Sequence, residues 1–236
     1  MSNGIYVAMA GAVAQSTALD VASNNIANAG TTGYRAERMK FAQVLTKAKD
    51  EAFVRAAAGG TDTAEGQITE TGNPLDVAIR GDGMFSVATP RGTMYTRAGS
   101  FRVDNDHKLV SADGYAVQST DGKAITIPPD AKGVAIAGDG TVQADGQPIG
   151  QLQLSRFDPS ALSRAGGALF TATAKPLTGG AAPELQPGAV EGANFNVVHG
   201  VVDLVRISRS YEALHKMIES YKDMDDRVAR SSAGNG

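Results

Sequence analysis

Two short motifs carry residue types that can bind ions or nucleotides. Asp104–Asp106 begins like a calcium-binding loop, but Lys108 occupies the third ligand position and no glycine follows where such a loop must turn sharply. Gly81–Gly83 begins like a dinucleotide-binding fingerprint, but Ser86 replaces the last glycine and a second predicted strand follows in place of a helix. We interpret both motifs as turns, with the calcium loop and the nucleotide site as the less favoured alternatives.

The three histidines do not form an obvious site either. His107 lies in a predicted loop, while His199 and His215 lie on a predicted helix, without metal-ligand spacing and without a nucleophile beside them. No serine stands in a Gly-x-Ser-x-Gly elbow, and the absence of cysteine excludes thiolate metal sites, cysteine nucleophiles and disulfides. The sequence therefore predicts a protein that is not an enzyme and needs no cofactor or metal.

The composition indicates a folded protein without an affinity for polyanions. Its 236 residues, 42% of them hydrophobic, suffice for one large domain or two modest ones. A net charge of −3, from 22 basic and 25 acidic residues, makes nucleic acid an unexpected partner. We find neither an uninterrupted apolar run of membrane-spanning length nor the basic flank and dense apolar run of a conventional secretory signal. We expect no stable insertion into a membrane.

Each end of the chain has a helical pattern with an apolar seam. The pattern from Gly4 to Ala29 is rich in small residues, which let another helix approach closely. A second helix is predicted from about Phe195 to Arg230, with Asn194 as its N-cap. Seam residues recur in alternating steps of three and four, as in a coiled coil. They are Ile5, Ala8, Ala12, Gln15, Leu19, Ala22 and Ile26 at the N-terminus and Leu204, Ile207, Tyr211, Leu214, Ile218, Tyr221 and Val228 at the C-terminus, where Asp225 interrupts the seam at one position.

The middle of the chain alternates apolar and polar residues in short runs separated by Asp-Gly turns, which is typical of strands. The regular spacing favours an antiparallel sandwich or barrel. For residues 37–58 the pattern also allows a helix, and residues 166–192, rich in glycine, alanine and proline, suit an extended return connection. The runs are residues 75–79, 85–87, 101–103, 125–127, 134–136 and 152–154.

The predicted fold class is thus α+β. Residues 1–33 and 195–236 form a discontinuous helical coiled-coil domain, residues 34–74 form an extended connector, and residues 75–194 form a β-rich outer domain with its return connection. Helical ends of this kind predict a subunit that joins its own termini, and its neighbours' helices, into a larger assembly.

Several blocks, in the same order along the chain, resemble a known family. Residues 24–34, Asn-Asn-Ile-Ala-Asn-Ala-Gly-Thr-Thr-Gly-Tyr, closely resemble the N-terminal signature of the bacterial flagellar rod and hook proteins, also called the axial protein family. The opening residues and the chain length resemble its proximal-rod members most. Leu214, Lys222 and Ala193 depart from the residue types that the family pattern leads us to expect. The further blocks that resemble the family are residues 73–79, 81–85, 95–101, 113–115, 191–194 and 209–212.

The resemblance implies a structural subunit of the proximal rod, the drive shaft that transmits torque. It implies that the terminal helices pair in the inner layer of a helical tube, with other rod proteins and copies of the chain as neighbours. It also implies export through the flagellar type III apparatus without a cleaved signal peptide, and a place in the periplasmic rod of the basal body. The predicted assembly interface comprises Ile5, Leu19, Asn24, Asn25, Ile26, Asn28, Thr31, Thr32, Gly33, Tyr34, Leu204, Ile207, Tyr211, Leu214, Ile218, Tyr221 and Val228.

Three alternatives are less well supported by the residues. A distal-rod subunit of the same family is the nearest of them. A β-sandwich module that binds a polysaccharide such as peptidoglycan, with the helices as an oligomerising stalk, needs an exposed aromatic platform, whereas tryptophan is absent and aromatic residues make up only 6% of the chain. An enzyme lacks any constellation of titratable residues and is the weakest alternative.

Overall fold

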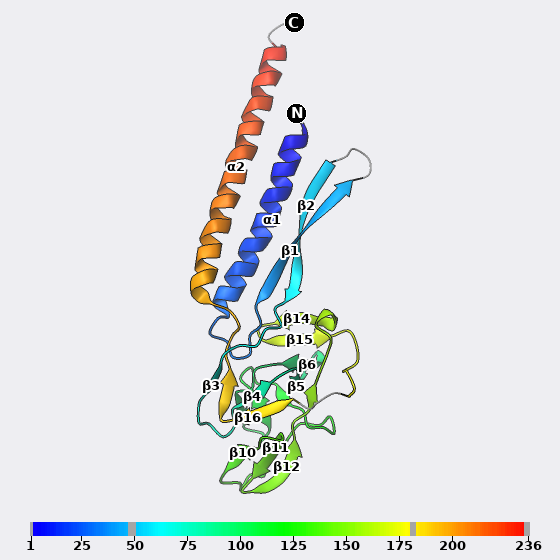
Figure 1. Ribbon diagram of the computed structural model, residues 1–236, viewed down its shortest axis with the longest axis vertical. Coiled ribbons are helices and arrows are strands. Elements are labelled where there is room, and N and C mark those ends of the chain that lie inside the picture. The colour runs from blue at the N-terminus through cyan, green and yellow to red at the C-terminus, as the bar shows by residue number, and fades with distance from the viewer. Residues whose placement is uncertain (1, 47–50, 180–182, 234–236) are drawn as a thin grey trace. The chain divides into compact units, whose positions relative to one another are not determined.

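The chain forms an α+β fold with one long helix at each end and an antiparallel, β-rich middle, as the sequence predicts (Figure 1). The computed structural model describes residues 2–46, 51–179 and 183–233. It divides into unit 1, which comprises Met1–Ala27, Glu37–Gly60 and Asn196–Gly236, and unit 2, which comprises Asn28–Ala36 and Thr61–Phe195. The chain therefore passes from one unit to the other several times.

In unit 1, the helices α1 (Ser2–Ala27) and α2 (Val197–Ala233) lie side by side and run in opposite directions (Figure 1). Small residues of α1 allow a close approach. A Cβ on Gly11 would lie 3.3 Å from Leu214 Cδ1, and one on Gly4 would lie 2.9 Å from Tyr221 Cζ. The two predicted helices are confirmed, with ends that differ from the expected ones by two or three residues.

Two residues of the predicted C-terminal seam, Leu214 and Tyr221, lie at the contact with α1, opposite Gly11 and Gly4. Ala8, Ala12 and Ala22 are buried, and the larger seam residues of both helices are half-buried. The side chain of Val228 lies outside the described residues. On α2, the alternating steps of three and four thus identify the face that packs against α1.

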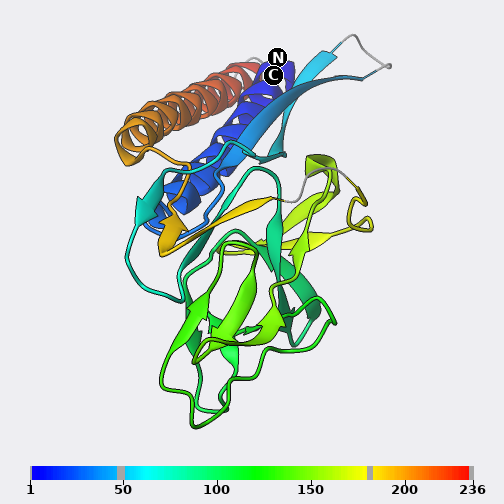
Figure 2. The same ribbon diagram turned by 60° about the horizontal axis from the view of Figure 1, so that its bottom comes forward.

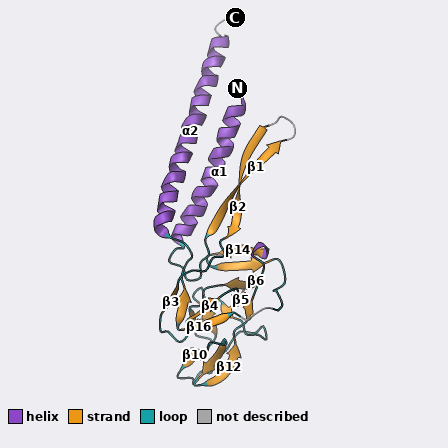
Figure 3. Ribbon diagram, in the orientation of Figure 1, coloured by secondary structure: helices purple, strands orange, loops and turns teal. Residues whose placement is uncertain are grey.

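A pair of strands also belongs to unit 1. Strands β1 (Glu37–Thr46) and β2 (Glu51–Thr61) pair in a two-stranded sheet, and Figure 3 shows them running in opposite directions. The helix that the sequence also allowed for residues 37–58 is therefore wrong, and strands occupy a segment expected to be an extended connector. Strand preference depends on a pairing partner more than on local periodicity, which explains why the pattern left the segment ambiguous.

Unit 2 consists of antiparallel strands, shown from a second direction in Figure 2. Its largest sheet has eight strands in the order β14-β15-β6-β5-β9-β8-β7, with β13 added to β5. A three-stranded sheet β10-β11-β12 and the pairs β16-β4 and β17-β3 complete it. The bounds are β3 Ile68–Glu70, β4 Val77–Arg80, β5 Met84–Thr89, β6 Gly92–Thr96, β7 Phe101–Val103, β8 Leu109–Ser111, β9 Ala116–Val117, β10 Val134–Ile136, β11 Thr141–Ala144, β12 Gln147–Gln151, β13 Leu154–Ser155, β14 Leu162–Gly166, β15 Leu169–Ala172, β16 Glu184–Pro187 and β17 Ala189–Glu191, with a short 3-10 helix at Pro159–Ala161.

The core of unit 2 is built from the alternating apolar residues. Val77, Phe85, Val87 and Phe101 are buried in it, and the rings of Phe85 and Phe101 meet edge to face with 5.1 Å between their centroids. Residues 125–127 contribute two buried isoleucines but form no strand, only an isolated bridge from Thr126. The expected return connection includes strands, since β16 and β17 pair with β4 and β3.

Candidate assembly interface

The turn after α1 depends on a glycine. Gly33 has φ 67°, and a Cβ at this position would overlap the backbone nitrogen of Ala98. Its own amide donates a hydrogen bond of 2.7 Å to the carbonyl oxygen of Glu191. Only glycine combines this conformation with so close an approach of two backbones. The structure thus gives Gly33, a predicted assembly residue, a role inside unit 2.

We expect Gly33→Ala to lower the free energy of unfolding of unit 2 by about 1–3 kcal/mol, the range for strained backbone at such sites. The added methyl group also displaces the Ala98 backbone. Thermal and urea unfolding of the purified chain would measure the loss. Gly30→Ala is the matched control, because a Cβ on Gly30 meets no atom within 4 Å. Equal stability of the two variants would contradict the prediction.

Three charged side chains form a buried network in unit 2. Glu191 Oε1 lies 2.7 Å from Arg35 Nη2, and its Oε2 lies 2.8 Å from Arg97 Nε. The exposed fractions of the Glu191, Arg97 and Arg35 side chains are only 1%, 3% and 6%. Burial lowers the pKa of the Arg35 guanidinium from its ordinary value, and the adjacent Glu191 carboxylate opposes that shift. Arginine remains charged in proteins, so one carboxylate holds two buried cations.

Backbone groups complete the network. Arg97 Nη1 donates to the carbonyl oxygens of Gly81 and Gly83 at 2.8 and 2.7 Å, and its Nη2 donates to the Ile79 carbonyl at 3.1 Å. Glu191 Oε1 also accepts from the amide of Gly66 at 2.9 Å. Buried charges are tolerated when hydrogen bonds satisfy their donors and acceptors in this way. The network therefore fastens several loops of unit 2 to one another.

The side chain of Asn194 makes a further set of hydrogen bonds in unit 2. Its Oδ1 accepts from the amide of Ala36 at 2.6 Å, and its Nδ2 donates to the carbonyl oxygens of Asp62 and Ala64 at 3.1 and 2.8 Å. The prediction that Asn194 caps the last helix is wrong because its amide group is engaged in these bonds. Asn196 has the capping contact instead, since its Oδ1 accepts from the amide of His199 at 3.2 Å.

Glu191 and Asn194 bind the segments by which the chain enters and leaves unit 2. Residues 28–36, 61–66 and 191–195 are held together by their hydrogen bonds, and each adjoins a point where the chain passes to unit 1. We call Arg35, Arg97, Glu191 and Asn194 the clamp. The clamp fixes the ends of these segments within unit 2.

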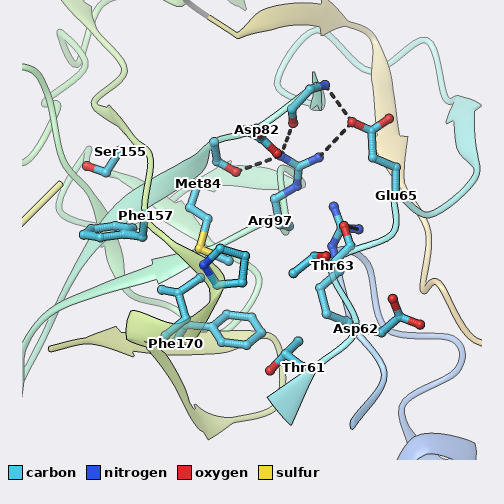
Figure 4. A pocket seen from close by; sticks show the side chains of 15 residues that line it. Thr61, Asp62, Thr63, Glu65, Asp82, Met84, Arg97, Ser155, Phe157 and Phe170 are labelled. Atoms are coloured by element: carbon cyan, nitrogen blue, oxygen red, sulfur yellow. Dashed lines mark hydrogen bonds and ion pairs between the residues drawn. The ribbon is translucent and has the colours of Figure 1, made fainter. Parts of the chain in front are cut away.

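A pocket of about 180 Å³ lies next to the clamp (Figure 4). Arg97 and Glu65 reach it from one side, with 4.0 Å between Arg97 Nη2 and Glu65 Oε1, while Phe157 and Phe170 form an apolar wall. The donors of Arg97 are already engaged by the backbone and by Glu191. Among the residues that the structure describes, no group of three or more His, Asp or Glu could hold a metal ion.

Tyr34, the residue before Arg35 of the clamp, is buried in unit 2. Its ring lies under the guanidinium of Arg164, 4.5 Å from the ring centroid, and that guanidinium donates to the backbone carbonyl of Arg35. A cation over an aromatic face is an attractive contact. Tyr34 thus holds the first entering segment in place, which gives this second predicted assembly residue a contact within its own unit.

The three asparagines Asn24, Asn25 and Asn28 differ in their surroundings. Asn25, only 5% exposed, donates through Nδ2 to the Glu37 carbonyl and accepts through Oδ1 from the Glu37 amide, both at 2.9 Å. Asn28 lies in the turn, where its carbonyl accepts from the Thr31 amide at 2.9 Å. Asn24 is exposed on α1. Asn25 therefore attaches the start of β1 to α1, and an intersubunit role for the cluster stays a prediction.

We expect Asn25→Ala to destabilise unit 1 by about 1 kcal/mol, because it removes both hydrogen bonds to the half-buried backbone groups of Glu37. The sharpest readout is hydrogen exchange of the Glu37 amide, which should accelerate. Ser23→Ala, at an exposed position of the same helix, serves as the control. Unchanged protection at Glu37 would show that the Asn25 contact is dispensable.

The sequence analysis missed two exposed apolar faces of unit 1. Tyr6, Met9 and Val13 form the α1 face, with exposed fractions of 59%, 49% and 67%. Valines at positions 197, 198, 201, 202 and 205 form the α2 face, with exposed fractions of 45%, 71%, 45%, 63% and 44%. Both sets repeat at helical spacing outside the seams, which is the signal that was available. Contiguous apolar surface of this kind marks an interaction site.

Helix α1 is long and apolar as a whole, although its apolar residues are not consecutive. Within the described part of the chain, Gly4–Ala27 is long and apolar enough to cross a membrane by length and composition, with a mean hydropathy of 1.3. Polar residues such as Gln15 and Asp20 interrupt the segment, so it is not an uninterrupted apolar run. Five of its alanines, at positions 8, 12, 14, 18 and 22, are nevertheless buried, as in the core helix of a folded protein.

Three family models match successive parts of the chain. Residues 5–35 match the flagella basal body rod protein model, residues 78–144 the flagellar hook protein FlgE/F/G D1 domain, and residues 186–231 the flagellar basal body rod FlgEFG protein C-terminal domain. The flagellar basal-body rod protein FlgF of Mesorhizobium japonicum is 30% identical over 236 aligned positions, which cover 98% of each chain. The chain belongs to the flagellar basal-body rod protein family.

Other relatives include both FlgF and FlgG proteins. The rod protein FlgF of Escherichia coli is 31% identical, with 98% of both chains covered. The rod protein FlgG of Agrobacterium fabrum is 33% identical, with 96% of this chain and 98% of its own covered. Each of the three matched segments of this rod-family chain supplies one member of the ion network: Arg35, Arg97 and Glu191.

Proposed function

We propose that this protein is a structural subunit of the flagellar basal-body rod that assembles through its terminal helices. The full-length similarity to rod proteins carries the proposal. The exposed apolar faces of α1 and α2 support it, because they supply surface for neighbours. Copies of the chain and other rod proteins are the proposed neighbours, and the protein acts without catalysis, nucleic acid or stable membrane insertion.

Within the rod, we propose the proximal position, that of FlgF. The alignment with Mesorhizobium japonicum FlgF needs 236 positions, whereas the alignment with Agrobacterium fabrum FlgG needs 263. This chain has 236 residues, so the FlgF alignment needs few insertions. Sequence identity alone does not separate the two, because it is 30% and 33%. The location follows: the rod in the periplasm, reached through the flagellar type III export apparatus without cleavage of a signal peptide.

A drive shaft must transmit torque through each subunit without yielding. The clamp supports that role, because it ties residues 28–36, 61–66 and 191–195 together at the points where the chain leaves unit 2. Because these three segments are bonded to one another, a force applied to one of them is shared by the other two. The proposed consequence is a subunit whose unit 2 does not open when force is applied to its connections.

Deletion of the gene tests the proposal. We expect cells that lack the protein to form no complete rod and hook and to lose swimming, and the full chain to restore both. Electron microscopy of isolated basal bodies supplies the readout, and antibody labelling of the chain along the rod decides between the proximal and distal positions. Complete rods in the deletion strain would overturn the function, and label next to the hook would overturn the position.

The polysaccharide-binding alternative is not favoured by unit 2. In the part of unit 2 that the structure describes, every tyrosine and phenylalanine is buried or half-buried. A sugar-binding platform needs aromatic faces that are open to solvent, so the described surface of unit 2 does not offer one.

A further inference from the structure

The pocket beside the clamp is built entirely from residues of unit 2, and its lining is amphipathic (Figure 4). Apolar side chains, among them Met84, Phe157 and Phe170, form its wall, and the carboxylates of Glu65 and Asp82 belong to its rim. Glu65 and Asp82 are exposed, whereas Met84 and Phe170 are buried. The pocket therefore combines negative charge that solvent can reach with a buried apolar surface.

The two arginines that line the pocket are engaged by the protein itself. Arg97 Nε donates to Glu191, and its Nη1 and Nη2 donate to three backbone carbonyl oxygens. Arg35 Nη2 pairs with Glu191, and its Nη1 donates to the carbonyl oxygen of Thr63 at 3.0 Å. Their positive charges are thus held by the protein, and the pocket is poorly suited to an anion.

Two carboxylates gather at one turn of the rim. Glu65 Oε1 accepts from the amide of Gly81 at 2.7 Å, which places it beside the turn that carries Asp82. Asp62, the third acidic residue of the lining, accepts from the Ala64 amide at 3.0 Å within its own turn. Among the residues that the structure describes, none forms a hydrogen bond or ion pair with the Asp82 carboxylate. Asp82 is thus available to a positively charged ligand, with Glu65 close by.

The volume of the pocket restricts what it can hold. Its 180 Å³ is several times the share of one water molecule in the liquid, about 30 Å³. It is smaller than the pockets of roughly 300–1,000 Å³ that hold drug-sized ligands. A nucleotide or an organic cofactor is therefore too large for it, whereas one long side chain fits.

Charge, apolar wall and size together favour a guanidinium group on an apolar stem. A guanidinium is planar and weakly hydrated, pairs with carboxylates and stacks on aromatic rings, whereas a lysine ammonium is strongly hydrated. Unit 2 already contains one such contact, because the Arg164 guanidinium lies 5.3 Å from the ring centroid of Phe170. Phe157, which is half-buried, is the ring of the wall that remains for a ligand.

We propose that the pocket binds one arginine side chain of a neighbouring protein in the rod. The guanidinium pairs with the carboxylates of Glu65 and Asp82, and the methylene stem lies along Phe157. The identity of the neighbour as a rod protein rests on the proposed function. Charge complementarity at an interface contributes more to the choice of partner than to raw affinity. The pocket thus gives unit 2 its own means of recognising a neighbour, separate from the terminal helices.

NMR titration of the full, isotope-labelled chain with Nα-acetyl-arginine amide tests the pocket. We expect saturable shifts of the backbone amide signals of Glu65, Asp82 and Gly83. The citrulline analogue has nearly the same shape without the charge and should leave these signals in place. The lysine analogue should bind more weakly than the arginine compound, because its ammonium gains less from the aromatic wall.

Asp82→Asn should weaken binding of the arginine compound by about two- to fivefold, because an exposed ion pair contributes little. Asp113→Asn is the matched control, since Asp113 is also an exposed aspartate before a glycine in a turn and does not line the pocket. Equal shifts with the arginine and citrulline compounds, or no shifts at all, would overturn the proposal. Equal affinities of the two variants would overturn the role of Asp82.

Charge reversal in cells tests whether the ligand belongs to a neighbour in the rod. We expect Asp82→Lys to lower the fraction of basal bodies with complete rods, and Asp113→Lys to leave it unchanged. Both purified variants should unfold at the same temperature as the unaltered chain, because both positions are exposed. Equal fractions of complete rods would overturn the neighbour as the source of the arginine. Complete rods in the deletion strain would instead remove the rod function, while binding measured on the purified chain would stand.

Discussion

Glu191→Gln is expected to lower the free energy of unfolding of unit 2 by about 3–5 kcal/mol, the range for breaking a buried ion pair by removing one partner. The side chain keeps its size, but its negative charge disappears. The guanidinium groups of Arg35 and Arg97, within 2.7 and 2.8 Å of its oxygens, would then lose the one buried carboxylate that pairs with both of them. Calorimetry or urea unfolding of the purified chain would measure the loss.

Two further variants make this prediction specific to the network. Glu184→Gln removes the same charge from an exposed position on β16 and should change stability by less than about 0.5 kcal/mol, as surface substitutions do. Arg35→Met added to Glu191→Gln should recover part of the loss, because one uncompensated cation is removed and the two changes are coupled. A Glu191→Gln chain as stable as the Glu184→Gln chain would refute the importance of the network.

Ile218→Asp is expected to abolish incorporation of the chain into rods while unit 2 remains folded. Ile218 is half-buried at the seam between α1 and α2, and burying a large apolar side chain contributes roughly 1.5–3 kcal/mol. A carboxylate at this position loses that contribution and also resists leaving water. Cells that carry only this variant should not swim, and their basal bodies should lack the protein.

Ser220→Asp is the matched control, because it introduces the same carboxylate at an exposed position two residues further along α2. Hydrogen exchange of unit 2 should be the same in both variants and in the unaltered chain. Normal swimming of the Ile218→Asp strain would mean that the seam does not support assembly. Loss of protection in unit 2 would mean that the variant acts by unfolding the whole chain.

Local patterns predicted the elements of this fold well where the pattern was long. The seams in steps of three and four predicted both helices and the face of α2 that meets α1, because helical periodicity is written in consecutive residues. Alternation predicted the strands around Val77, Phe85 and Phe101, because strand side chains alternate between a core and a second face. Residues 37–58 were ambiguous, because β1 is stabilised by β2 and by Asn25 rather than by its own sequence.

The candidate site residues were also only partly predictable from the sequence. The resemblance of residues 31–34 to the family motif identified Gly33 and Tyr34 as site residues but did not predict their contacts. The structure shows Gly33 against the Ala98 backbone and Tyr34 beneath Arg164. The exposed α1 and α2 faces had a readable helical spacing. Their open state became clear only when the structure showed which sides of each helix the partner helix covers.

The sequence by itself determined the terminal helices, their seams, the β-rich middle and the rod family, because each follows from residues close together in the chain. The tertiary structure decided the clamp. Arg97 and Glu191 are 94 residues apart, and Asn194 is 158 residues from Ala36, so no local pattern connects them. Charged and amide side chains find such partners only when the chain folds, because their hydrogen bonds depend on direction and distance in space.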